Sequence, residues 1–442
     1  MKKVIKRIIA SLTFCLLLVG CGKFFRYILI DDTASYTRIA LHEMYEQDNI
    51  DTLFVGSSHC YRAFIPEILD KELKEGVNTF NLGTSAQDLD GSYMLIKEAA
   101  KYNDIKNIYL DLYFAFAFGE AYKDRTQMTS TYIISDYLKP SLDKIQYLLN
   151  ASAKDYYSSN FITSRRYWNK IFDADYVKNL LIKKGTKAYK NYGYKYVTGE
   201  SEWYASKGYV ANKGKVENWN FFGWEGWDSI KLTKLSEDWL NSLEDIIDFC
   251  DKKGITLTFV VIPMSNYLLS SVGNYDDYVS LVRKLFVDKN VKYYDFNMCK
   301  EKYFPNDSSL FLDDDHLNCF GAESFNHLFA DFVNGEISED ELFYDTYEEK
   351  VNNLEPTVFG ISYHDIDTGK GEKVRNCKIV STGNDNLEYK IVLSPQDGES
   401  RILQKFSSNR YFDIDPAEHG VINITYRLTD KPNETKKIDV TY

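Results

Sequence analysis

The sequence predicts an α/β protein: a doubly wound parallel sheet, interrupted by an aromatic-rich helical insertion and followed by a C-terminal all-β, sandwich-like domain. Short apolar strands alternate with amphipathic helices over residues 32–118 and again over 235–337. Parallel strands that are buried on both faces have this apolar character. The alternation lapses over residues 119–234, and from residue 356 to 442 short strands recur with turns and without helices. That last pattern is typical of a small β-sandwich.

Length and composition support more than one folded unit. The chain has 442 residues, 44% of them hydrophobic and 15% aromatic, which is ample for a packed core. Its formal net charge of −12 argues against a nucleic-acid partner, because phosphate binding needs a basic face. Only 8 residues are proline, so long disordered linkers are not expected.

Residues 1–21 are expected to be an export signal or a membrane anchor. Lysines and an arginine precede the apolar run 8–19, as in a secretory signal. The residues Leu18-Val19-Gly20-Cys21 resemble a bacterial lipobox, which implies lipid attachment at Cys21. The alternative is an uncleaved anchor that continues to Ile30. Both interpretations place the body of the protein at the extracytoplasmic face of a bacterial cell membrane.

The other cysteines suggest neither a disulfide framework nor a zinc site. Seven cysteines are present, and five remain when Cys15 and Cys21 are set aside. That number is odd, and no C-x-x-C spacing occurs among them.

The first half of the α/β unit should contain three strands. The apolar runs 51–55, 78–82 and 107–112 have the length and composition of buried strands. Helices are expected near 66–75 and 91–102, between these strands.

The second half should contain two more strands, at 255–262 and 292–296. Helices are expected near 236–253, 276–287 and 322–333. Five such strands can form one doubly wound sheet, in which ligands bind beyond the carboxyl ends of the strands near the topological switch point.

Two polar motifs follow strands of this sheet. Gly56-Ser57-Ser58 ends the first strand, and Asp313-Asp314-Asp315-His316 follows the fifth. A serine hydroxyl becomes a nucleophile when a histidine accepts its proton, and a carboxylate holds that histidine in the correct tautomer. Ser58, His316 and Asp313 are therefore a candidate catalytic triad.

Other interpretations of these residues exist. Ser57 and Ser58 could be ordinary turn residues, and the aspartates could form a solvated acidic loop or a weak calcium site, although they lack the spacing of a calcium-binding loop. Asp314 and Asp315 are alternatives to Asp313. His59 is a rival base, but its adjacency to Ser58 directs the two side chains differently and favours a structural or substrate-contact role.

Three segments resemble the motif blocks of the SGNH (GDSL-like) hydrolase family. They are Gly56-Ser57-Ser58, Asn81-Leu82-Gly83-Thr84-Ser85, and Leu312–Asn318 followed by Gly321-Ala322. The match extends over about residues 45–118 and 235–335. Ser57 stands where the family has aspartate, as in the branch that resembles D-alanyl transfer proteins and polysaccharide O-acetyltransferases. The resemblance implies a flavodoxin-like sheet, with Ser58 as nucleophile, His316 as base and Asp313 as orienting acid. It also implies that the backbone amides of Ser58 and Gly83 bind the oxyanion.

One family block is missing. The family has Gly-x-Asn-Asp after the third strand, whereas this chain has Leu112-Tyr113-Phe114-Ala115-Phe116. The asparagine normally donates to the oxyanion, and loss of one such donor typically costs ~10²–10³ in rate. The hydroxyl of Tyr113 is a candidate replacement.

The insertion is rich in tyrosine and tryptophan. It can be interpreted as a helical cap with an aromatic core, or as an aromatic platform for sugar rings. Residues 218–227 are the best candidate for a substrate-lining loop. The candidate substrate-lining residues are His59, Tyr113, Trp219, Trp224 and Trp227.

The sequence thus predicts a membrane-tethered, extracytoplasmic serine esterase or acyltransferase that acts on acylated glycans or cell-envelope polymers through an acyl-serine. No cofactor, metal or nucleic-acid partner is expected. The alternative is a catalytically weak or inactive carbohydrate-binding or assembly protein that retains the fold. No chemistry stands out in the C-terminal domain, which is expected to be an accessory module.

Overall fold

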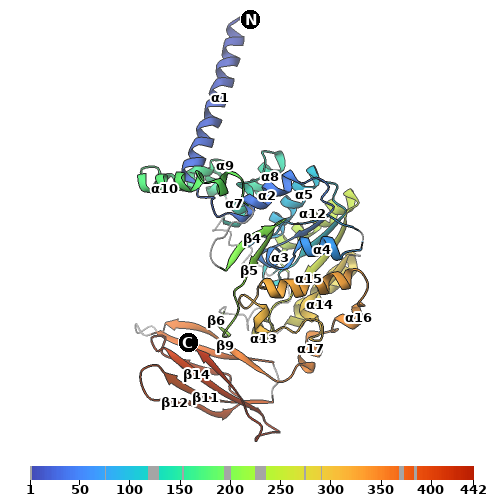
Figure 1. Ribbon diagram of the computed structural model, residues 1–442, viewed down its shortest axis with the longest axis vertical. Helices are drawn as coiled ribbons and strands as arrows, with labels where there is room; N and C mark the ends of the chain where they lie inside the picture. Colours follow the sequence, from blue (N-terminus) through green and yellow to red (C-terminus); the bar gives the residue numbers. More distant parts are fainter. Residues whose placement is uncertain are drawn as a thin grey trace.

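A long N-terminal helix, an α/β body and a β-rich end follow one another along the molecule (Figure 1). This computed structural model describes residues 2–74, 76–117, 129–151, 154–193, 201–223, 235–272, 275–289, 291–367, 373–382 and 386–442. The mixed α/β class with a central parallel sheet is confirmed, as is the presence of further antiparallel sheets.

The central sheet has five parallel strands in the order β2-β1-β3-β7-β8. The strands are β1 (Thr52–Val55), β2 (Thr79–Asn81), β3 (Asn107–Asp111), β7 (Thr256–Val261) and β8 (Lys292–Asp295). All four residues of β1 are buried, as expected for the middle of a sheet covered on both faces.

Helices cover this sheet. They are α2 (Tyr36–Glu46), α3 (Ser58–Ala63), α4 (Pro66–Glu72), α5 (Leu89–Tyr102), α12 (Glu237–Lys253), α13 (Asn266–Val272), α14 (Tyr275–Lys289), α15 (Cys319–Val333), α16 (Glu339–Leu342) and α17 (Tyr347–Asn353). Helix α15 packs against α3 and α4, and α5 packs against α12. The ring of Phe54 in β1 stacks on Phe64 and meets the edge of Phe329 in α15, which ties α3 and α15 to the sheet core.

Helix α1 (Lys2–Leu29) projects from the body. Among the described residues it is the one helix with the length and hydropathy to cross a membrane, with a mean hydropathy of 2.1 over its most apolar window. Cys21 lies within this helix and is exposed. The base of α1 is fixed to the body by the buried Lys184, whose ammonium donates to the carbonyl groups of Tyr27 and Ile30.

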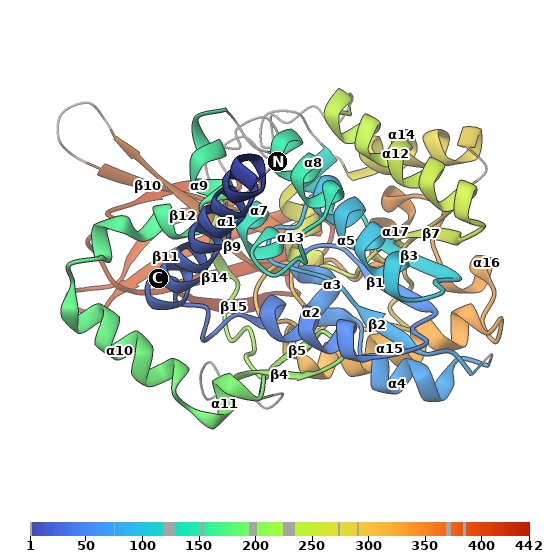
Figure 2. The same ribbon diagram turned by 90° about the horizontal axis from the view of Figure 1, so that it is seen from above.

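The insertion begins with helices and continues with strands. The helices are α7 (Thr129–Ser135), α8 (Leu142–Asn150), α9 (Tyr157–Phe161), α10 (Ala174–Lys184) and α11 (Lys187–Lys190). Figure 2 shows α7, α8, α9 and α10 grouped near α1. The strands β4 (Glu202–Ser206), β5 (Tyr209–Asn212) and β6 (Asn220–Phe222) follow. The sequence predicted an aromatic-rich helical insertion, and its described residues contain strands as well as helices.

The hairpin β4–β5 follows from its turn. Lys207 and Gly208 both have positive φ, 47° and 86°, as a two-residue turn of the mirror-image type requires. Gly208 also lies against the end of β2, where a Cβ atom would come within 1.7 Å of the Asn81 carbonyl oxygen. The hairpin thus covers the sheet edge beside the turn that follows β2.

Two four-stranded sheets form the C-terminal part and share one hydrophobic core. One sheet has the order β13-β10-β9-β6 and the other β12-β11-β14-β15. The strands are β9 (Val358–Asp367), β10 (Lys373–Ser381), β11 (Leu387–Pro395), β12 (Arg401–Ser407), β13 (Tyr411–Ile414), β14 (Gly420–Leu428) and β15 (Lys436–Thr441).

Strand β6 joins the insertion to this C-terminal part, because it pairs in parallel with β9. The Trp219 ring stacks on Tyr267 of α13 at 5.2 Å, and the Trp219 carbonyl accepts a hydrogen bond from the Ile361 amide. Gly360 leaves room for this contact, since a Cβ there would lie 2.0 Å from the Trp219 carbonyl oxygen. The β-rich end is therefore docked on the α/β body through α13 and β6.

Candidate functional site

Ser58 lies beyond the carboxyl end of β1, because it is the first residue of α3 and only Gly56 and Ser57 separate it from the strand. Gly56 makes the preceding turn, and a Cβ there would lie 2.6 Å from the Cβ of Asp111 at the end of β3. Ser57 caps α3 by accepting a hydrogen bond from the His59 amide. The chain therefore turns sharply after the strand and leaves Ser58 partly exposed while Ser57 is buried.

His316 and Ser58 meet, although they are 258 residues apart in the chain. The distance from His316 Nε2 to Ser58 Oγ is 2.7 Å. On the other side of the ring, His316 Nδ1 lies 2.9 Å from Asp313 Oδ1 and 3.1 Å from Asp313 Oδ2. The three residues of the predicted triad thus form one hydrogen-bonded chain.

A second carboxylate shares His316. Asp315 Oδ1 lies 2.6 Å from His316 Nδ1, closer than either oxygen of Asp313. Asp313 Oδ1 also accepts hydrogen bonds from the backbone amides of Asp315 and His316, so it shapes the loop that carries the imidazole. Sequence spacing favoured Asp313 alone, whereas the structure brings both carboxylates to the same nitrogen.

His59 belongs to a buried chain behind the triad. Its Nδ1 lies 2.9 Å from Ser57 Oγ, and its Nε2 lies 3.3 Å from Asp315 Oδ2. The imidazole stacks on His316 at 4.4 Å and on Tyr113 at 4.3 Å. His59 is 4% exposed and covered on both faces, so the expectation that it lines the substrate site is corrected: its position is structural.

Ser57 continues this chain inward, because its hydroxyl lies 3.5 Å from Asp111 Oδ2. Burial raises the pKa of Asp111 to about 6, with the charge of His59 and hydrogen bonds from Ile262 and Ser57 acting in the opposite direction. Sequence analysis missed Asp111, and its only local signal was a carboxylate at the end of an otherwise apolar strand.

Tyr113 does not offer its hydroxyl to an oxyanion in this structure. The hydroxyl donates to Asp315 Oδ2 at 3.2 Å, and the ring covers His59. Burial and the neighbouring carboxylates raise the pKa of Tyr113 far above its usual range, so the group keeps its proton. Tyr113 therefore supports Asp315 instead of replacing the missing asparagine, and its place in the substrate lining stays a prediction.

Gly83 lies beside the Ser58 turn, as predicted. A Cβ at Gly83 would be 2.7 Å from the Tyr61 nitrogen and 2.9 Å from the Ser57 carbonyl oxygen, so only glycine fits. Its amide, however, donates to Asn81 Oδ1 at 3.0 Å. The donor that sequence analysis assigned to the oxyanion is therefore engaged in this structure.

Thr84 is a further polar group at the same turn. Its side chain is 4% exposed, and its Oγ1 has no hydrogen-bond partner among the described residues. A buried hydroxyl without a partner is costly, which marks the position as one where a ligand group can bind. Thr84 lies inside the motif Gly83-Thr84-Ser85, but the sequence analysis gave it no role.

The two carboxylates control the charge of His316. Desolvation lowers the pKa of His316, but the hydrogen bonds and charges of Asp313 and Asp315 outweigh it and raise the pKa to about 10. Burial raises the pKa of Asp314 to about 7, and repulsion by Asp315 and Asp313 adds to the increase. Desolvation also opposes ionisation of Asp315, but His59 and His316 hold its pKa well below the usual range. The two carboxylates therefore favour the protonated form of His316.

Of the three tryptophans predicted to line the substrate site, only Trp219 lies within the described residues. Trp219 packs on Tyr267 and Phe311 at the junction with β9, which explains its burial without a ligand. Trp224 and Trp227 lie outside the described residues.

Two groups of side chains bring potential metal ligands within 4.8 Å of one another: His59 with Asp315 and His316, and Asp313 with Asp314 and Asp315. Within the first group, the same atoms that would bind an ion form the imidazole–carboxylate contacts described above.

No known family model matches the chain, and none of the curated proteins is significantly similar to it. The geometry of the site is thus the main guide to its function.

Proposed function

We propose that this protein is a membrane-tethered serine esterase or acyltransferase that acts outside the cytoplasm on acylated glycans or other cell-envelope polymers. The observation that carries the proposal is the hydrogen-bonded chain from Ser58 through His316 to Asp313 and Asp315. Such a chain is the arrangement by which an imidazole activates a serine for acyl transfer.

In the proposed reaction, His316 in its neutral form accepts the proton of Ser58 as Ser58 Oγ attacks the acyl carbonyl carbon. The imidazolium, stabilised by Asp313 and Asp315, then donates that proton to the leaving alcohol oxygen. This leaves an acyl-serine. Attack by water on the acyl-serine completes hydrolysis, whereas attack by a sugar or polyol hydroxyl completes transfer.

The oxyanion would accept hydrogen bonds from the backbone amides of Ser58 and Gly83. The Gly83 amide has to exchange its bond to Asn81 for one to the substrate, which makes this donor conditional on substrate binding. Together with the missing asparagine, this predicts a modest rate for the acylation step.

Two features of the fold support the resemblance to SGNH hydrolases. The strand order β2-β1-β3-β7-β8 corresponds to the flavodoxin-like order 2-1-3-4-5. Ser58 follows β1, beside the switch point between β1 and β3 where ligands bind in such sheets. Helix α1 supplies the tether, either as an uncleaved anchor or through lipid at Cys21.

The test uses the full-length protein in detergent, assayed on an aryl acetate and on acetylated glycans. We expect wild-type turnover, an acyl-enzyme detectable by mass spectrometry on the peptide that contains Ser58, and loss of both in Ser58→Ala. An inactive wild type, or an active Ser58→Ala variant, contradicts the proposal.

The second candidate is a catalytically weak or inactive carbohydrate-binding or assembly protein. It is favoured by the raised pKa of His316 and by the engaged Gly83 amide. Glycan binding without turnover at any pH between neutral and 10 would indicate this function.

A further inference from the structure

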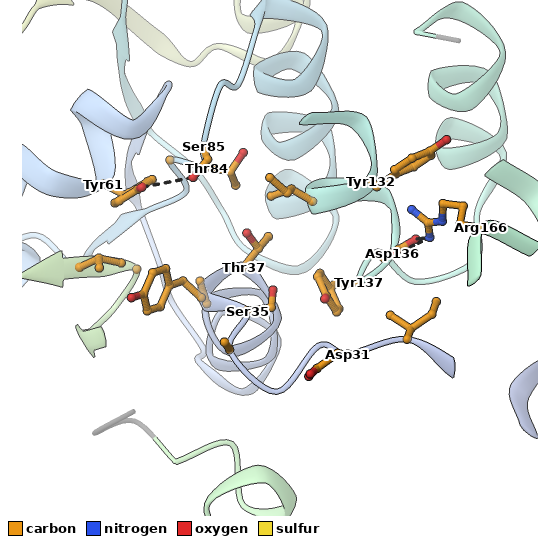
Figure 3. Close-up of a pocket in the computed structure, with 18 of the residues that line it drawn as sticks. Asp31, Ser35, Thr37, Tyr61, Thr84, Ser85, Tyr132, Asp136, Tyr137 and Arg166 are labelled. Atoms are coloured by element: carbon orange, nitrogen blue, oxygen red, sulfur yellow. Dashed lines mark hydrogen bonds and ion pairs between the residues drawn. The ribbon is translucent and has the colours of Figure 1, made fainter. Parts of the chain in front are cut away.

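A cavity of about 740 Å³ lies beside the proposed catalytic turn: Gly83 and Tyr61, which border that turn, line the cavity, whereas Ser58, His316 and Asp313 do not. This volume lies within the range of pockets that hold small ligands. Its walls come from five parts of the chain: the turn after β2, Tyr61 of α3, the segment from the end of α1 into α2, the hairpin β4–β5, and helix α7 with the neighbouring helical part of the insertion (Figure 3).

Hydroxyl groups and tyrosine rings dominate the lining. Ser35, Thr37 and Tyr137 lie opposite the pair formed by Tyr61 and Ser85, whose hydroxyl oxygens are 3.2 Å apart (Figure 3). Hydroxyls both donate and accept hydrogen bonds, and aromatic faces suit the apolar side of a sugar ring. The lining thus fits a polyhydroxylated ligand.

Thr84 supplies an independent indication of a ligand. It lines the cavity, is buried, and has an Oγ1 without a hydrogen-bond partner in the part of the chain that the structure describes. Because this oxygen is sealed from solvent, a hydroxyl of a bound sugar would satisfy it once the Thr84 side chain turns toward the cavity.

The charges of the cavity disfavour an anionic ligand. Arg166 is the only cationic side chain in the described lining, and its Nη2 lies 2.6 Å from both carboxylate oxygens of Asp136 (Figure 3). Asp31 adds a second carboxylate, whose pKa is lowered because hydrogen bonds from Lys183 and Thr33 outweigh desolvation. A phosphate needs a cation that is free to pair with it, and this lining offers none.

We propose that this cavity binds sugar residues of an uncharged, O-acylated glycan and presents the glycan to Ser58. The second half of this statement rests on the proposed function, whereas the binding site itself does not. The cavity also borders Ile30, directly after α1, so the glycan is held at the end of the body from which α1 projects.

Binding is tested in the full-length Ser58→Ala protein, so that turnover does not interfere, by titration with a neutral acetylated oligosaccharide. Ala34 lines the cavity and is exposed, so Ala34→Trp should fill it without disturbing the core. We expect Ala34→Trp to weaken binding by roughly tenfold or more, and Thr84→Val to weaken it by about 2–10-fold, the range for one lost hydrogen bond.

Ala417→Trp is the matched control, because Ala417 is exposed in the C-terminal sheets and far from the lining residues in sequence. It should bind like the parent protein. Unchanged binding in both Ala34→Trp and Thr84→Val, with melting temperatures near that of the parent, overturns the proposal. Equal competition by poly(glycerol phosphate) overturns the assignment to an uncharged glycan.

Hydrolysis of aryl acetate by the protein with Ser58 intact separates this proposal from the proposed function. If the oligosaccharide binds and Ala34→Trp weakens that binding while aryl acetate is not hydrolysed, the cavity assignment stands and the enzyme assignment fails. If aryl acetate is hydrolysed and the oligosaccharide does not bind, the enzyme assignment stands and the cavity assignment fails.

Discussion

Two chains of serine, histidine and aspartate meet at Asp315. The outer chain joins Ser58, His316 and the carboxylates of Asp313 and Asp315. The inner chain joins Ser57, His59 and Asp315. Their serine–histidine distances are nearly equal, 2.7 Å and 2.9 Å.

The difference between the chains lies in access. Ser57 and His59 are 3% and 4% exposed, and Ser57 is also occupied as the cap of α3. Ser58 is partly exposed at the carboxyl end of β1. A hydrogen bond from serine to histidine therefore does not define a nucleophile, because the hydroxyl must also be reachable by an acyl group. The partial exposure of Ser58 agrees with the role proposed for the outer chain, whereas the inner chain contacts Asp315 through the buried His59.

The largest expected effect separates the two serines. Ser58→Ala should lower kcat for aryl acetate by about 10⁴-fold or more, since the nucleophile is removed. Ser57→Ala should keep measurable turnover, because the outer chain remains intact. Steady-state assays with equal amounts of folded protein check this. A larger loss in Ser57→Ala than in Ser58→Ala would assign the nucleophile to the inner chain.

The next effect separates the two carboxylates. Asp313→Asn and Asp315→Asn should each lower kcat, by up to about 10⁴-fold for the residue that sets the tautomer of His316. Each substitution removes a negative charge beside His316, so the pKa of His316, raised to about 10 in the wild type, should decrease.

The pH dependence of kcat/KM measures this change. Serine attack needs neutral His316, so the rate should rise with pH as His316 loses its proton. The rising limb should move to lower pH by about one unit or more in Asp315→Asn, as expected when an adjacent opposite charge is lost. A rising limb at the same pH in wild type and Asp315→Asn would show that Asp315 does not interact with the imidazole of His316.

A smaller effect is expected at His59. His59→Gln removes the imidazole that stacks on His316 and faces Asp315, while Gln keeps polar atoms for Ser57. We expect a decrease of kcat by about tenfold, the low end for a group that acts through another residue. The pH profile should shift as well, whereas a role in packing alone would change only the melting temperature.

The smallest effect on activity is expected at Asp111, at the inner end of the buried chain. Its pKa is raised from 3.8 to about 6, so the fold favours the protonated carboxyl. That contribution to stability is present below pH 3.8 and is lost as the pH rises through about 6.

Asp111→Asn should remove this dependence. The free energy of unfolding of the variant, relative to wild type, should rise by about 2 kcal/mol between pH 4 and pH 7. Denaturant unfolding of the two proteins at both pH values checks it. A constant difference would show that Asp111 is ionised equally in the folded and unfolded chains.

The sequence predicted the parts of this molecule that depend on local pattern. The run 51–55 corresponds to β1 (Thr52–Val55), and the helix expected from residue 66 begins there as α4. Ser58, His316 and Asp313 were found because strand ends of one parallel sheet converge, and short motifs at such ends can be paired in advance.

The remaining features depend on contacts between distant segments. The stacking of His59 between Tyr113 and His316 and the sharing of His316 with Asp315 leave no periodic trace in the sequence. Trp219 was interpreted as a sugar platform because aromatic residues in a loop serve either packing or binding. Its partner Tyr267 decides between these roles, and only the fold reveals it.

The pairing of β6 with β9 affects the state of the chain during its synthesis. The polypeptide is synthesised from its N-terminus, so β6 emerges well before its partner β9. Until β9 arrives, β6 presents an open strand edge and Trp219 lacks part of its cover, and such edges invite aggregation. A chain that stops before residue 358 cannot supply that cover. The C-terminal sheets thus protect the insertion from aggregation, because only a chain that includes β9 can pair with the exposed edge of β6.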